Sequence, residues 1–157
     1  MSTLRVGTVL NQAGTKAPTI GVQSMVRLEG GNGFGSVNTR IRRFLTTVTN
    51  TGSDIVYVDD ASSGASFEIQ TNGVYAISYT DNPNAAGDVY IGLNTTTGAS
   101  APADLRQILA AATVSNTTYR ANAAWTGYLP AGSQIRAYLT TPQGGTNQVF
   151  FTITRVS

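Results

Sequence analysis

The chain has 157 residues, the length of one domain, and only 11% of them are charged. It contains neither cysteine nor histidine, which excludes disulfides, thiol nucleophiles, Cys/His metal sites and a Ser-His-Asp triad. The net charge of +2 is too small to indicate a nucleic-acid partner. The apolar runs are too short to span a membrane, and the first residues lack the pattern of a secretory signal.

The residues available for catalysis are few. There are two glutamates, Glu29 and Glu68, and a single lysine, Lys16. Paired carboxylates for glycoside hydrolysis are conceivable only through aspartates. We therefore expect no enzymatic activity and no cofactor. The abundance of threonine, glycine, serine and asparagine favours a sheet protein with many turns.

Residues 1–35 differ from the rest of the chain. One short strand is permitted near the start, and the Gly30–Gly35 stretch holds four glycines in six residues, which we expect to break any element. The segment is too short and too polar to form a core. We predict an N-terminal attachment arm over 1–35 that leans either on its own domain or on a neighbour, with Leu4, Arg5, Val6, Val9, Lys16, Ile20 and Val22 as its contact residues.

From residue 41 onward, alternating apolar and polar residues predict strand after strand. Asn72-Gly73 has the composition of a hairpin turn. Residues 105–112 remain open, because their apolar spacing fits a short helix while the surrounding pattern favours an extended run. The predicted strands cover residues 44–50, 55–58, 66–70, 74–79, 89–93, 119–128, 135–139 and 148–156. Such closely spaced short strands predict an all-β sandwich or jelly roll.

Three stretches resemble the complement globular-head and tumour-necrosis-factor-like jelly rolls. Residues 67–79, FEIQTNGVYAISY, are similar to the central hairpin of that family. Residues 125–136, WTGYLPAGSQIR, resemble its Leu-x-x-Gly-Asp-x-Ile turn, and 148–153 stand where its closing strand would be. The resemblance implies a jelly-roll β-sandwich over residues 36–157. Because Ser133 stands where the family usually has aspartate, we transfer no calcium site.

A second resemblance concerns provenance. Residues 33–44, GFGSVNTRIRRF, look like the opening of this domain in small bacteriophage virion proteins, and the first residues are similar to attachment segments of phage fibre and decoration proteins. The resemblance implies a virion structural protein on the surface of the phage particle. We expect a capsid decoration or cement protein whose arm contacts the major capsid protein or another virion protein. The alternative is a receptor- or glycan-binding tip of a tail or head fibre. A secreted ligand of the same fold is disfavoured by the missing signal sequence.

Members of the resembled family usually assemble as trimers, so we expect a homotrimer. Five aromatic residues could line its interface, the other interpretation being ordinary core positions: Tyr57, Tyr75, Tyr79, Phe150 and Phe151.

Two further groups could contact partners. Arg40, Arg42 and Arg43 form the one basic cluster, which could face an acidic partner surface, be solvated, or be paired within the chain. At the distal end, Tyr119, Trp125 and Tyr128 together with the threonine- and asparagine-rich loops 94–102 and 142–147 would suit carbohydrate recognition. Two acidic groups are weaker candidates for a hard cation, one with Asp54, Asp59 and Asp60 and one in the loop from Asp81 to Asp88.

Overall fold

The computed structural model describes residues 23–37, 40–94, 105–115, 120–141 and 148–157. These residues form antiparallel strands and one short 3₁₀ turn. The elements are β1 (Met25–Phe34), β2 (Arg42–Thr51), β3 (Ile55–Asp60), β4 (Gly64–Ile69), β5 (Gly73–Asp81), β6 (Gly87–Leu93), η1 (Leu105–Gln107), β7 (Ile108–Val114), β8 (Ala121–Leu129), β9 (Gln134–Leu139) and β10 (Phe150–Arg155).

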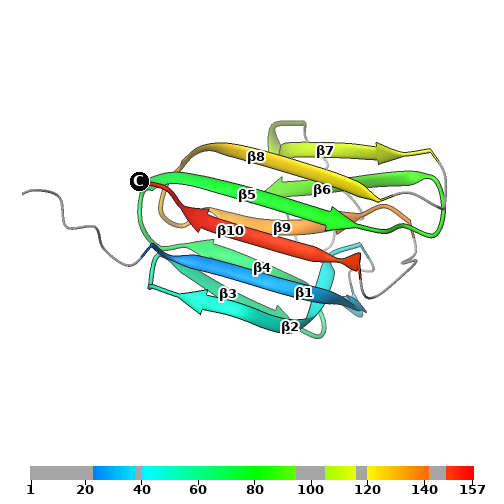
Figure 1. The fold of residues 1–157 in the computed structure, drawn as a ribbon, viewed down its shortest axis with the longest axis horizontal. Helices are drawn as coiled ribbons and strands as arrows, with labels where there is room; N and C mark the ends of the chain where they lie inside the picture. Colours follow the sequence, from blue (N-terminus) through cyan, green and yellow to red (C-terminus); the bar gives the residue numbers. More distant parts are fainter. Residues whose placement is uncertain (1–22, 38–39, 95–104, 116–119, 142–147) are drawn as a thin grey trace, which may run out of the picture.

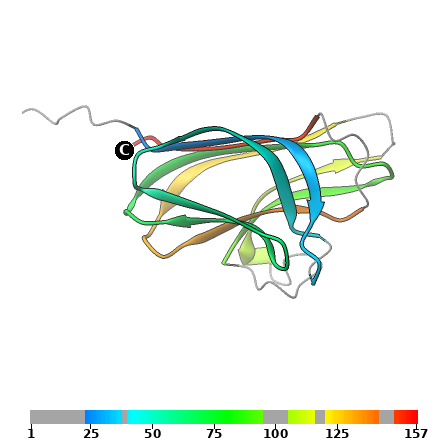
Figure 2. The same ribbon diagram turned by 90° about the horizontal axis from the view of Figure 1, so that it is seen from below.

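The strands form two five-stranded sheets packed face to face (Figures 1 and 2). The front sheet has the order β2-β1-β10-β5-β8, and the back sheet has the order β3-β4-β9-β6-β7. Neighbours in each sheet are mostly far apart in sequence, as expected for Greek-key connections. The predicted all-β jelly-roll sandwich is confirmed.

The structure of residues 105–112 decides between the short helix and the extended run that the sequence left open. Only Leu105–Gln107 adopt a helical turn, and Ile108–Val114 continue as strand β7, paired with β6. The alternating exposure of Ala111, Ala112 and Thr113 fits this extended conformation. The apolar residues at helical spacing were therefore misleading, because the chain forms a sheet edge there.

The predicted arm extends too far toward the domain. Met25–Phe34 are strand β1, which lies inside the front sheet between β2 and β10. Val26 and Leu28 are fully buried in the core. The glycine-rich stretch does not end the strand, because Gly33 adopts a positive φ of 71° within the irregular pairing between Gly31 and Phe34. At Gly35 a Cβ would lie 2.4 Å from the backbone oxygen of Ser62, so only glycine permits this close approach.

The turn at Asn72-Gly73 is not a hairpin. It joins β4 in the back sheet to β5 in the front sheet, so the chain changes sheets there. Residues before β2 also connect the sheets. Ile41 forms an isolated bridge with Tyr138 of β9, and the Arg40 carbonyl accepts a hydrogen bond from the Leu139 N–H at 3.0 Å. The chain then enters β2 of the front sheet and closes this end of the sandwich.

The core lies between the two sheets and is rich in aromatic rings. Phe151 of the front sheet stacks on Phe67 of the back sheet, with ring centroids 4.1 Å apart. Phe44 packs against both rings at centroid distances of 6.4 and 5.9 Å. These contacts join β2, β4 and β10 and fix how the sheets face one another.

Candidate functional site

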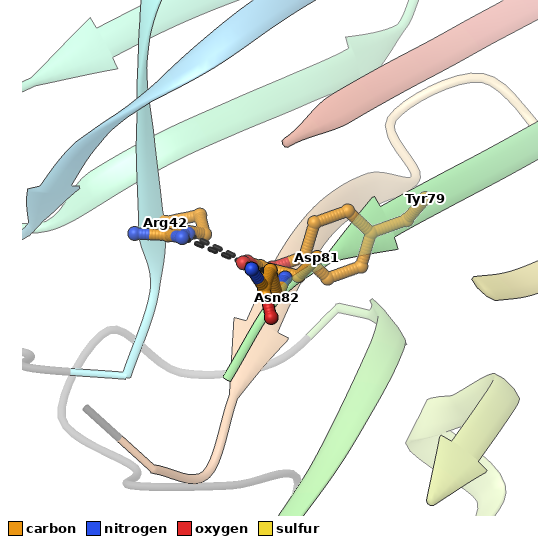
Figure 3. A network of polar contacts seen from close by, with 4 residues as sticks. All are labelled: Arg42, Tyr79, Asp81 and Asn82. Atoms are coloured by element: carbon orange, nitrogen blue, oxygen red, sulfur yellow. Dashed lines mark hydrogen bonds and ion pairs between the residues drawn. The ribbon is translucent and has the colours of Figure 1, made fainter. Parts of the chain in front are cut away.

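A buried ion pair lies at the end of the sandwich where β5 finishes (Figure 3). Arg42 donates from Nε to Asp81 Oδ2 and from Nη2 to Oδ1, each at 2.6 Å, and both side chains are fully buried. The Tyr79 hydroxyl also donates to Oδ2. The Asn82 backbone N–H donates to Oδ1 at 2.7 Å. Each carboxylate oxygen therefore accepts two hydrogen bonds, which compensates its burial.

The surroundings raise the pKa values of Arg42 and Tyr79. Burial by itself would lower the pKa of Arg42, but the hydrogen bond and charge of Asp81 outweigh it and raise that pKa. The guanidinium also lies over the Phe34 ring, 4.9 Å from its centroid. Burial first, and then the Asp81 charge, raises the pKa of Tyr79 well above its ordinary value. The arrangement links the first residue of β2 to the last residue of β5 and is suited to a structural role.

Of the interpretations of the arginine cluster, pairing within the chain is confirmed for Arg42 and Arg43. Arg42 is buried in the ion pair just described, because it lies in phase with the core residue Phe44. Arg43 is bound by Asp59, with Nε and Nη2 at 3.0 and 2.8 Å from the carboxylate oxygens. Arg40 precedes β2 in a turn and is partly exposed. The three side chains therefore offer no common basic surface to a partner.

The predicted aromatic interface is wrong for three of its five residues. Tyr75, Tyr79 and Phe151 are fully buried within the single chain and cannot contact another copy. Tyr57 is half-buried and stacks on Phe67 at a centroid distance of 5.2 Å. Only Phe150, 36% exposed, counts among the exposed residues. The interpretation as core positions applies to the buried three, because they alternate with outward-facing residues along their strands.

Those outward-facing residues form an uncharged surface, here called the outer face. Asn122 Nδ2 donates to Ser78 Oγ at 3.1 Å and to Thr80 Oγ1 at 2.7 Å, so these side chains share one side of the sheet. The sequence analysis overlooked this face, although the small residues alternating with the aromatics of β5 were a signal for it. Its members on β5, β8 and β10 are Val74, Ala76, Ser78, Thr80, Asn122, Ala124, Thr126, Tyr128, Phe150, Thr152 and Thr154.

The predicted recognition group of Tyr119, Trp125 and Tyr128 is not a loop cluster. Tyr119 lies outside the described residues. Trp125 is in the middle of β8, half-buried and packed against the core. Tyr128 is 61% exposed and, three residues later, points to the opposite side of the strand. Trp125 and Tyr128 therefore do not form one aromatic platform for a sugar.

A polar clamp holds the chain where it enters β1. Ser24 Oγ donates to Asp54 Oδ2 at 2.7 Å, and the Asp54 N–H donates back to Ser24 Oγ at 3.0 Å. Arg155 Nη1 lies 3.4 Å from Asp54 Oδ1. Hydrogen bonds from Thr71 and Ser24, with the Arg155 charge, lower the pKa of Asp54. The clamp fixes the start of β1 beside the C-terminal end of β10 (Figure 1).

The predicted arm residues Leu4, Arg5, Val6, Val9, Lys16, Ile20 and Val22 lie outside the described residues. The first described residue is Gln23, two residues before the start of β1. No helix among the described residues is long and apolar enough to cross a membrane.

The acidic residues do not converge on a cation site. Asp54 precedes β3 whereas Asp59 and Asp60 end it, so the strand separates them. Asp81 is bound by Arg42, and Asp88 accepts hydrogen bonds from Tyr90 at 2.9 Å and Thr113 at 2.6 Å. Within the described ranges, no three His, Cys, Asp or Glu side chains are grouped as metal ligands.

Comparison with known proteins identifies a shared fold. Neither a family model nor a curated protein matches the sequence. The crystal structure of murine APRIL at pH 8.0 has a TM-score of 0.58 and 13% identity, covering 86% of this chain and 100% of that one. Rabbit GITRL has a TM-score of 0.52 and 16% identity, covering 85% and 94%. Bushbaby GITRL has a TM-score of 0.53 and 13% identity, covering 86% and 95%. The chain therefore has the tumour-necrosis-factor-like jelly-roll fold.

Proposed function

We propose that this chain is a bacteriophage virion structural protein, a homotrimeric capsid decoration or cement protein attached by its N-terminal segment. The observation that carries the proposal is the outer face, because the outward residues of β5, β8 and β10 are all uncharged. An uncharged sheet face of small residues can pack closely against another copy of itself. The phage provenance is supported by the sequence resemblance of residues 33–44 and of the N-terminus.

Self-association through the outer face has favourable physical chemistry. Burying its threonine methyls, its alanines and Val74 gains roughly 25 cal/mol per Å² of apolar surface. No charged group on these positions has to lose its hydration, which would oppose association. Tyr128 and Phe150 lie near opposite ends of the face and can anchor the contact with larger apolar surfaces. We infer that this face, and not the buried aromatics, joins the subunits of a trimer.

Attachment would use the end of the sandwich where the chain begins. The clamp of Ser24, Asp54 and Arg155 holds the first described residues at that end, beside the C-terminus. In a trimer with a three-fold axis, three N-terminal segments would therefore leave from equivalent positions. Three segments that engage one surface together gain avidity without any new kind of contact. The partner would be the major capsid protein or another virion protein.

The proposed role is mechanical and requires no catalysis, cofactor, nucleic acid or membrane. The described charged groups fit this role, since Arg42 with Asp81 and Arg43 with Asp59 form pairs that join one strand to another. The N-terminal segments would lie across neighbouring capsid subunits and add contact area at their junctions. The stabilisation they give would then appear as resistance of the particle to heat or dilution.

Deleting residues 1–22 tests the attachment. We expect the deletion variant to keep a solution mass of three times 16.4 kDa, less the deleted segments, and to lose co-sedimentation with particles that lack the protein. Retained co-sedimentation would refute attachment through this segment. A matched control is Ala111→Arg, an exposed position on β7 outside the clamp and the outer face, which should bind as the wild type does.

Immunogold electron microscopy of particles tests the placement. Label spread over the head supports decoration. Label confined to fibre or tail ends would refute the decoration role and favour the receptor- or glycan-binding alternative. The aromatic cluster that suggested this alternative is not formed by Trp125 and Tyr128 in the structure. Absence of label from every particle would refute the virion location itself.

A further inference from the structure

The outer edge of β2 is an unprotected strand edge. β2 is the last strand of the front sheet, and no described strand pairs with its other side. Four consecutive residues, Leu45 to Val48, are exposed, with Leu45 at 59% and Val48 at 47%. In a strand with one covered face, exposure would alternate. Here both faces of β2 are uncovered along its middle.

The residues of this edge favour pairing with another strand. The stretch Phe44–Ser53, FLTTVTNTGS, contains no charged residue and no proline. Threonine and valine favour extended structure, and charges or prolines are the usual means by which proteins block an open edge. The neighbouring edge strand β3 is different, because it is shorter and ends in Asp59 and Asp60. The β2 edge is therefore the better template for an added strand.

The N-terminal segment enters the sandwich next to this edge. Thr51, the last residue of β2, donates from Oγ1 to the Gln23 carbonyl oxygen at 3.4 Å, and Met25 pairs with Thr51 across the ladder. A chain leaving Gln23 has to pass only β2 to reach its outer side. Two strand spacings are about 10 Å, whereas residues 11–22 can span about three times that distance.

We propose that the outer edge of β2 binds residues Thr3–Leu10 of the same chain as an additional strand. In that segment Leu4, Val6 and Thr8 alternate with their neighbours, as a strand requires. Backbone hydrogen bonds would provide the pairing, and its apolar side chains would cover Leu45 and Val48. The short connection gives an effective concentration in the millimolar range, which favours the same chain over a neighbour. The edge then holds the N-terminal segment in the free protein, whatever the partner on the particle is.

Cross-linking tests the pairing directly, because the chain has no native cysteine. We would introduce Val6→Cys with Val48→Cys, and as a control Val6→Cys with Ala111→Cys, an exposed position on β7 at the far edge of the back sheet. After treatment with a short bismaleimide at low protein concentration, we expect an intrachain cross-link in the first variant, at least tenfold above the control. A cross-link at twice the chain mass would refute the same-chain source. Equal yields in both variants would refute the β2 site.

Hydrogen exchange provides a second readout that needs no cysteine. In the full chain we expect amide protons among Leu45–Val48 to exchange at least tenfold more slowly than after deletion of residues 1–22. Charging the edge with Leu45→Lys and Val48→Lys in the full chain should give the same acceleration, with the fold checked by Trp125 fluorescence. Unchanged exchange in the deletion variant would overturn the proposal, and its failure would leave the attachment test above unaffected.

Discussion

Arg42 and Asp81 form a bidentate ion pair, and both N–O distances are 2.6 Å. Neither side chain is exposed to solvent. The pair joins the first residue of β2 to the last residue of β5, which are separated in the front sheet by β1 and β10. The pair also lies at the end of the sandwich, where β5 finishes and the segments that connect the strands begin. The structure of that end therefore depends on the Asp81 carboxylate, in which each oxygen accepts two hydrogen bonds.

Removing one partner of this pair should be strongly destabilising. Arg42→Ala leaves a buried carboxylate without its main donors, and we expect the free energy of unfolding to fall by about 3–5 kcal/mol. Arg43→Ala is the matched control, because its pair with Asp59 is partly exposed and should contribute less than about 1 kcal/mol. Urea unfolding followed by Trp125 fluorescence measures both. Similar losses in the two variants would contradict the structural role assigned to the buried pair.

Both members of the pair were recognisable in the sequence, although they were not recognised. Arg42 lies two residues before Phe44, and Asp81 lies two residues after Tyr79, so each is in phase with core residues of its strand. A charge in phase with the core requires a buried counter-charge, and these two could have been matched. The in-phase position of Arg42 relative to Phe44 was missed, because the closeness of three arginines in the sequence suggested that they share one surface.

The strands from β2 to β10 were largely predictable, because alternation of apolar and polar residues indicates that one face of a strand is buried. β1 was not, because its glycines mask the alternation of Val26 and Leu28 and their φ values are invisible in a sequence. It was also easier to predict that one face of a strand is buried than to predict what that face packs against. The alternation of Tyr75, Ile77 and Tyr79 showed that they share a side, but whether that side met the back sheet or another subunit depended on which strands packed opposite.

The pH dependence of stability should include a contribution from Asp54. Its pKa is lowered in the folded protein by Thr71, Ser24 and Arg155, so the folded state binds this proton less readily than the unfolded state. The stabilisation is present above the unfolded pKa of about 3.9 and is lost as pH falls through the folded pKa. Asp54→Asn should flatten the loss of stability between about pH 5 and pH 2. Chemical denaturation across this range measures the difference.

The cause of that shift can be tested separately. Ser24→Ala removes one hydrogen bond to the Asp54 carboxylate, at 2.7 Å in the wild type. The pKa of Asp54, followed by carboxyl-carbon NMR, should rise toward its ordinary value. A pKa that stays where it is in the wild type would mean that the Ser24 hydrogen bond has no part in the clamp.

Gly127 should tolerate no side chain because of the indole of Trp125. A Cβ at Gly127 would lie 2.5 Å from Trp125 Cζ2, well inside contact distance. We expect Gly127→Ala to cost about 1–3 kcal/mol through overpacking. Trp125→Phe removes the atoms that collide, so the cost of Gly127→Ala should largely disappear in that background. A double-mutant cycle with circular dichroism measures this coupling, and additive losses would show that the contact is not the cause.

A charge in the centre of the outer face should separate the subunits without unfolding them. Ala76 lies on β5, between β10 and β8, so Ala76→Arg would place a guanidinium within the proposed interface. Desolvating that charge without a partner should shift the solution mass from three chains toward one, while the far-ultraviolet spectrum of the folded chain is retained. Val56→Arg on β3 adds the same charge to an exposed position outside this face and should leave the mass unchanged. Light scattering with size-exclusion chromatography reads both variants. If Ala76→Arg remains at three chains, another surface joins the subunits, and the uncharged character of β5, β8 and β10 must have a different origin.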